Sequence, residues 1–232
     1  MYALAAGAAG VGAIASAQLA EAKIVYTPAH VNVSLCHKYG IDLDHKGKGD
    51  IYLNWCAQLG ISYVVASSYF GINGVAVARV WPEPALAIFP GAEIGPARLF
   101  FGRSYRPLMA FISTGTTNWS GRWANGGKGV KNRYLGIKFK SKGQFHYGWA
   151  RITLTINGNS IKEVLLTGYA YETIPGKPII AGATKGPDEA EPAASLNTPA
   201  REPASLGMLA MGAPGLSIWR REDSVAATLE RN

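Results

Sequence analysis

Residues 134–171 read YLGIKFKSKGQFHYGWARITLTINGNSIKEVLLTGYAY, and this stretch decides the fold class. Apolar and polar side chains alternate from Tyr134 to Lys140 and again in the run from Phe145 to Ile156, which predicts half-buried β-strands. Asn157-Gly158-Asn159 predicts a tight hairpin, because Asn and Gly tolerate the positive φ of such turns. With a returning strand from Ile161 to Tyr171, the stretch predicts a three-stranded antiparallel meander.

The rest of the body also reads as short strands separated by Gly, Pro and Asn. The 28 Gly, the 11 Tyr and the low charged fraction of 16% are typical of turn-rich β proteins. With the meander, the further runs make about eight strands, which predicts an all-β domain over residues 23–184, an antiparallel β-sandwich or a jelly-roll-like fold. Residues 82–107 are expected to form a long surface loop. The further strands are expected at Lys23–Thr27, Ile51–Trp55, Ile61–Ser67, Gly74–Trp81 and Leu108–Ser113.

The first 22 residues are small and apolar and end in Ala20-Glu21-Ala22, a pattern that a signal peptidase cuts. We therefore predict a secretory signal peptide over residues 1–22. Met1 leads straight into the apolar run without a positively charged region, so we expect either a true start further upstream, which we favour, or inefficient export. The alternative is a buried Ala/Gly helix, which the many glycines disfavour.

Residues 185–203 are rich in Pro, Ala and Glu, and predict a disordered linker, because they cannot bury enough apolar surface to offset the entropy of ordering. Next come a Glu-Pro cue, a short apolar segment over residues 204–221 that ends in two arginines, and a tail over residues 222–232. The alternative for the apolar segment is an amphipathic helix packed on the domain.

This three-part order resembles the bacterial PEP-CTERM sorting signal, with Arg201 in place of the first proline of its cue. The resemblance implies that a short apolar helix anchors the exported protein transiently in the inner membrane. An exosortase then cuts near the cue and releases the body to the cell surface or extracellular matrix. The sorting residues implied are Glu202, Pro203, Arg220 and Arg221.

Cys36 and Cys56 are the only cysteines of the chain. In an oxidising compartment they predict a Cys36–Cys56 disulfide, and in a reducing cytosol they would remain buried thiols. The sequence leaves both open, because a bridge requires Cα atoms within about 7 Å.

Residues 42–50 read DLDHKGKGD and have the acidic and glycine spacing of an EF-type calcium loop. Lys46 takes the place of one oxygen ligand, and Leu53 stands where a bidentate Glu would complete the shell. We therefore predict a degenerate calcium loop, with a plain Asp/Gly turn as the alternative, and expect no other cofactor. The candidate Ca²⁺ ligands are Asp42, Asp44 and Asp50.

Between Glu93 and Glu163 there are twelve Lys or Arg residues and no Asp or Glu, which predicts an anionic partner. Aromatic residues interleave with these cations, and cations beside exposed rings can hold anionic polymers. For an exported protein we predict an anionic polysaccharide rather than nucleic acid, provided that the basic groups form one patch. The alternative is solvated lysines and buried aromatics. The candidate binding residues are Arg122, Trp123, Lys128, Lys131, Arg133, Lys138, Lys140 and Lys142.

No motif identifies a reaction. The four histidines lack metal-ligand spacing, and the sequence contains no Gly-x-Ser-x-Gly or His-Glu-x-x-His pattern. We therefore predict a structural or adhesive protein of the cell surface or extracellular matrix and favour a non-enzyme. One alternative is a secreted hydrolase of extracellular polymer, which would need a concave pocket with convergent polar groups of shifted pKa. The other is a purely structural matrix component, which predicts no pocket and a flat or edge-pairing surface.

Overall fold

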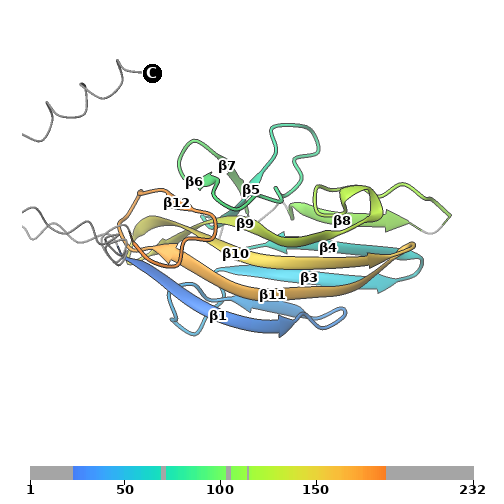
Figure 1. Ribbon diagram of the computed structural model, residues 1–232, viewed down its shortest axis with the longest axis horizontal. Coiled ribbons are helices and arrows are strands. Elements are labelled where there is room, and N and C mark those ends of the chain that lie inside the picture. The colour runs from blue at the N-terminus through green and yellow to red at the C-terminus, as the bar shows by residue number, and fades with distance from the viewer. Residues whose placement is uncertain (1–22, 69–71, 103–105, 114, 187–232) are drawn as a thin grey trace, which may run out of the picture. The chain divides into compact units, whose positions relative to one another are not determined.

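A computed structural model describes residues 23–68, 72–102, 106–113 and 115–186 (Figure 1). All of them belong to the first of two units of the chain, Met1–Ala190, whereas the second unit, Glu191–Asn232, lies outside the described residues. The predicted signal peptide, the sorting segment, the tail and the linker beyond Gly186 lie outside them too. Within the described part, no helix combines the length and the apolarity needed to cross a membrane.

The described residues form two large antiparallel sheets and one small ribbon, which confirms the all-β class. Two sheets around a common core are consistent with the predicted sandwich. The six-stranded sheet contains, in spatial order, β1 (Ile24–Asn32), β11 (Ser160–Glu172), β10 (Gln144–Asn157), β9 (Val130–Ser141), β5 (Gly74–Val77) and β7 (Leu99–Phe101). The four-stranded sheet contains β2 (Lys38–Ile41), β3 (Ile51–Gln58), β4 (Ile61–Ser67) and β8 (Leu108–Ser113). The ribbon pairs β6 (Glu93–Ile94) with β12 (Ile179–Ile180), and a 3-10 turn, η1, spans Asn125–Gly127.

The predicted meander is present as β9, β10 and β11, with Ala150 of β10 opposite Leu135 on one side and Tyr169 on the other. β5 is shorter than the strand expected over Gly74–Trp81. The chain turns back after Val77, and the amide of Ala78 then donates to the carbonyl of Pro84 at 2.9 Å. The apolar residues after Val77 therefore led to a predicted strand that is too long.

The main core lies between the two large sheets. Burying a side chain such as Val, Leu, Ile or Met in it stabilises the fold by roughly 1.5–3 kcal/mol relative to an exposed position. The four-stranded sheet provides Leu53, Val64 and Met109, and the six-stranded sheet provides Leu135, Ile137 and Ile152.

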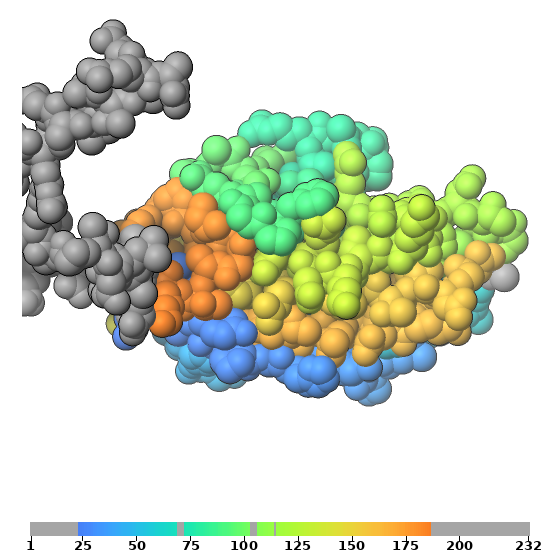
Figure 2. Space-filling model, in the orientation of Figure 1, coloured from blue at the N-terminus to red at the C-terminus, as the bar shows by residue number. Residues whose placement is uncertain are grey.

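A second apolar cluster covers the opposite face of the six-stranded sheet. Ile88 and Ile94 come from the segment expected to be a surface loop, and Ile179 comes from β12. They pack with Tyr134 and Trp149, so β9 and β10 are buried on both faces in their middle parts and not half-buried as predicted. Figure 2 shows residues around 85–95 (green) and 175–186 (orange) side by side on this surface. We call this covering the outer layer.

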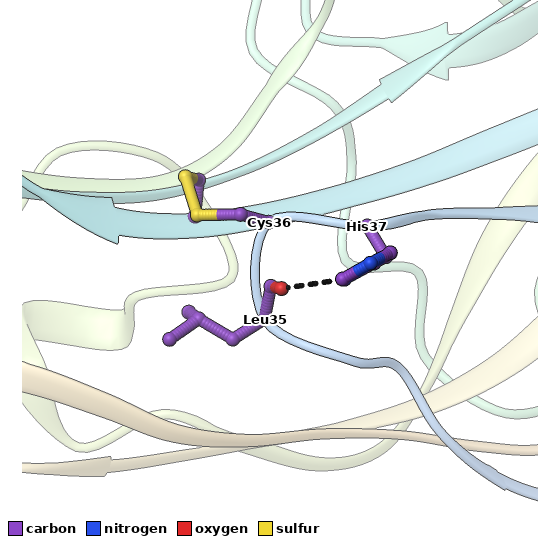
Figure 3. The surroundings of a disulfide bond; sticks show 4 residues. Leu35, Cys36 and His37 are labelled. Carbon is purple, nitrogen blue, oxygen red and sulfur yellow. Dashed lines mark hydrogen bonds between the residues drawn. A yellow bond between two sulfur atoms is a disulfide. The ribbon is translucent and has the colours of Figure 1, made fainter.

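Cys36 and Cys56 are joined by a disulfide with Cα atoms 4.3 Å apart (Figure 3). The bridge ties the turn before β2 to β3, where the amide of Cys36 also donates to the carbonyl of Trp55. Beside it, the ring Nδ1 of His37 donates to the carbonyl of Leu35 at 2.9 Å.

Candidate anion-binding site

Three arginines from separate parts of the chain line one hollow of about 420 Å³. Arg98 precedes β7, Arg122 lies in the loop before η1, and Arg133 belongs to β9. Asn125 and six apolar side chains form the rest of the wall, so the guanidinium groups lie beside an apolar surface on which a ring can rest. We call this the arginine hollow. Its apolar lining is Leu86, Ala87, Ile88, Phe89, Ala92 and Val130.

The register between the outer layer and β9 places Arg133. Ile88 and Tyr134 exchange two backbone hydrogen bonds, of 2.9 and 3.0 Å. Their neighbours Phe89 and Arg133 therefore meet, and the guanidinium carbon of Arg133 lies 3.4 Å from the centre of the Phe89 ring. This cation–π contact fixes the guanidinium at the mouth of the hollow without neutralising its charge.

Trp123 anchors the loop that presents Arg122. Its side chain is 0% exposed and lies in the main core, and its amide donates to the carbonyl of Met109 at 3.0 Å. Gly121 permits this approach, since a Cβ there would lie 2.2 Å from the Met109 carbonyl oxygen. The prediction that Trp123 contacts a ligand is therefore wrong: a fully buried ring cannot stack on a sugar. The neighbouring Arg122 is exposed.

The charge of the hollow is unbalanced. Arg98 donates from Nε to the backbone carbonyl of Glu93 at 2.5 Å, which leaves its charge uncompensated. Among the described residues, no carboxylate lies within 4.0 Å of any of the three guanidinium groups. Three unpaired arginines around an apolar wall are suited to a carboxylate, sulfate or phosphate carried on a ring.

The structure does not bring all the predicted basic residues together. Arg122 and Arg133 line the hollow, whereas the cations of the other end of β9 do not. Lys138 lies over the Phe145 ring at 4.2 Å, and Lys140 is about 23 Å from Arg133 at the usual rise of a strand. Lys128, Lys131 and Lys142 are exposed and lie outside the hollow. The hollow therefore contains two of the seven predicted cations, and the candidate site is reduced to it.

Arg98 was missed because the predicted stretch began at Trp119, although Arg98 itself stands beside aromatic residues, Phe100 and Phe101. Arg98 does belong to the longer run without Asp or Glu that begins after Glu93, and this run could have indicated it. Spacing along the chain does not reveal that β7 lies at the edge of the sheet to which β9 belongs.

The three candidate calcium ligands do lie together, with one oxygen from each of Asp42, Asp44 and Asp50 within 4.8 Å of the others. Each already has donors. Asp42 accepts from the amides of Lys46 and Gly47 at 3.1 and 2.7 Å. Asp50, 8% exposed, accepts from the amide of Leu43 at 3.0 Å, and Asp44 pairs with the Lys46 ammonium at 2.6 Å. The calcium site remains a prediction, in which Ca²⁺ would have to displace this ammonium.

The charged groups of this loop alter one another's pKa values. Burial, with smaller contributions from Asp44 and Asp42, raises the pKa of Asp50 to about 6, although the Leu43 hydrogen bond opposes the shift. Burial also acts to raise the pKa of Asp44, but hydrogen bonds from Lys46 and Ser141 and the charge of Lys46 lower it overall. The hydrogen bond to Asp44 raises the pKa of Lys46, which therefore stays protonated.

Lys46 and Ser141 form the pair that comes nearest to a hydrolytic arrangement, with Lys46 Nζ donating to Ser141 Oγ at 2.9 Å. A lysine that activates a serine must be neutral, whereas Asp44 keeps this one charged. The groups of shifted pKa in the described part, Asp44, Lys46, Asp50 and three tyrosines, do not line the arginine hollow. The arginine hollow is therefore not the pocket that the hydrolase alternative predicts.

Comparison of the chain with protein-family models, curated proteins and solved structures gives no match.

Proposed function

We propose that this protein is an exported cell-surface or extracellular-matrix protein whose β-sandwich binds an anionic polysaccharide in the arginine hollow. The observation that carries the binding proposal is the convergence of Arg98, Arg122 and Arg133 on one hollow in which no carboxylate of the described residues lies within 4.0 Å of a guanidinium group. The proposal of export rests on the predicted signal peptide over residues 1–22 and on the PEP-CTERM resemblance over residues 202–221. The apolar segment would anchor in the inner membrane, and an exosortase would cut near the cue.

The chemistry of the hollow favours an acidic sugar over a bare anion. Guanidinium forks bind carboxylate oxygens in pairs, and the apolar wall gives a surface for the C–H face of a sugar ring. Phe89 is largely exposed, with Arg133 over its ring. A free inorganic anion would leave this apolar surface uncovered.

The test measures binding of the full chain to polygalacturonate, which carries a carboxylate on every sugar, with dextran as the neutral polymer. We expect binding to polygalacturonate alone, weakened by added salt. Arg122→Gln should weaken it about tenfold or more, because a hydrogen bond to a charged group contributes about 1.5–3 kcal/mol.

The matched control is Lys162→Gln, an exposed cation of β11 that lies outside the hollow but in the same carboxylate-free run. It removes the same charge and should bind polygalacturonate like the parent protein. Equal weakening by both variants would show unspecific attraction to a basic protein, and unchanged binding of Arg122→Gln would exclude the hollow as the site.

A further inference from the structure

The most exposed tryptophan of the described residues lies close to the arginine hollow. Trp81 is 83% exposed, and it makes no ring contact with any residue that the structure describes. The loop that carries it follows β5 and projects from the sheet (Figure 1). Its base is closed by pairing of Val77 with Ala85 and by the hydrogen bond from Ala78 to Pro84. An indole held in water on a closed loop is available to a ligand.

The same loop is tied to the hollow at two points. Arg79 donates from Nη2 to the carbonyl of Ala97 at 3.4 Å, and Ala97 precedes Arg98 of the hollow. On the other side, Leu86 lines the hollow five residues after Trp81, so their Cα atoms are at most about 17 Å apart. A few linked sugar rings span such a distance.

The loop differs from the hollow in charge. Glu83 is two residues from Trp81, and its Oε2 is buried without a hydrogen-bond partner among the described residues. With Arg79 also two residues from Trp81, the loop has no net charge, so it gives an acidic sugar no net attraction but leaves the indole free to stack on the apolar face of a neutral one. The hollow, in contrast, attracts the acidic sugar.

We propose that Trp81 is a neutral-sugar subsite next to the acidic-sugar subsite of the arginine hollow. The ligand is then a polysaccharide in which acidic and neutral sugars adjoin. This proposal rests on the proposed function and adds the substrate class to it. Polygalacturonate, in which every sugar is acidic, would bind in the hollow but gain little affinity from Trp81.

The experiment uses the full chain with a length series of oligosaccharides that alternate glucuronic acid and N-acetylglucosamine, and with free glucuronic acid. We expect affinity to rise with length, and Trp81→Ala to lower the affinity of the longer oligomers about tenfold without changing that of glucuronic acid. Trp81→Phe, which keeps a ring, should retain part of the increase. Leu59→Ala, at an apolar residue of the β3–β4 turn that is even more exposed than Trp81, is the matched control and should bind normally.

The two proposals fail separately. If Trp81→Ala leaves the rise with length intact while Arg122→Gln still weakens every ligand, the neutral subsite is wrong and the hollow stands. If Arg122→Gln has no effect on glucuronic acid, the proposed function fails. If Trp81→Ala weakens binding to vesicles of zwitterionic lipid but not to the oligomers, Trp81 belongs to a membrane contact and the subsite is overturned.

Discussion

The outer layer can be tested at Gly136 of β9, which lies beneath it. A Cβ at this position would meet Ile88 Cδ1 at 2.9 Å, Ala76 Cβ at 3.0 Å and Ile94 Cγ2 at 3.2 Å. All three atoms belong to residues of the second cluster. Gly136→Val places three carbons in this space, and the outer layer must move to accommodate them.

The expected loss of stability follows from two opposing contributions. Overfilling a packed core costs about 1–3 kcal/mol, whereas replacing Gly in a strand by a residue with fewer unfolded conformations regains about 0.5–1 kcal/mol. We therefore expect Gly136→Val to lower the free energy of unfolding by about 1–2 kcal/mol. The value lies at the lower end of core substitutions, because Ile88 Cδ1 is the flexible end of its side chain.

A double-mutant cycle identifies the neighbour. Ile88→Val deletes the Cδ1 atom nearest to the new side chain, and alone costs about 1 kcal/mol. The double variant should lose less stability than the sum of the losses in the two single variants, with a coupling energy of about 0.5–1 kcal/mol. Ile112→Val, at a buried residue of β8 that does not belong to the second cluster, makes the same change away from the outer layer and should be additive. Urea denaturation followed by tryptophan fluorescence measures all the variants. Equal coupling with Ile88 and Ile112, or no destabilisation by Gly136→Val, would refute packing of residues 85–94 on the sheet.

Two further predictions concern the loop of Asp42, Asp44 and Asp50. Because the pKa of Asp50 is raised from 3.8 to about 6, the folded protein holds a proton that the unfolded chain releases. This proton contributes about 2–3 kcal/mol to the free energy of unfolding below about pH 4, and the contribution is lost as the pH rises through about 6. Asp50→Asn should flatten that slope in denaturation curves, and an equal slope in the variant would contradict the shift. For calcium, titration calorimetry should show Ca²⁺ binding that vanishes in Asp44→Ala and strengthens in Lys46→Gln, since the ammonium competes for the carboxylate. The absence of heat with the parent protein would end the calcium prediction.

The sequence predicted the meander because each signal there is local. Alternation sets the faces of β9 and β10, and Asn157-Gly158-Asn159 sets the turn between β10 and β11. The outer layer has no such signal, since Ile88 and Ile94 are isolated apolar residues among Pro and Gly. Their burial depends on pairing with distant partners, Tyr134 for Ile88 and Ile179 for Ile94. A loop prediction is the expected result of local reasoning on such a segment.

The candidate site was predictable in kind but not in extent. The charge imbalance after Glu93 indicates an anionic partner, and Arg122 and Arg133 follow from it. The sequence does not separate them from Lys138 and Lys140, because the hollow depends on the pairing of Ile88 with Tyr134, which no local pattern predicts. The prediction for Trp123 was wrong for a similar reason, because its burial, like the exposure of Phe89, depends on tertiary packing.

The arginine hollow also has an energetic consequence for the fold. Three like charges around one hollow repel each other in the folded protein and are separated in the unfolded chain, so the hollow lowers stability when no anion is bound. The Phe89 ring and the carbonyl of Glu93 offset part of this repulsion at Arg133 and Arg98 without removing a charge. An anionic ligand that binds the folded protein alone removes the remainder, and by linkage stabilises it in proportion to the logarithm of ligand concentration over Kd. Arginines placed only for solubility would gain nothing from convergence, and their position around one apolar wall is therefore an argument for binding.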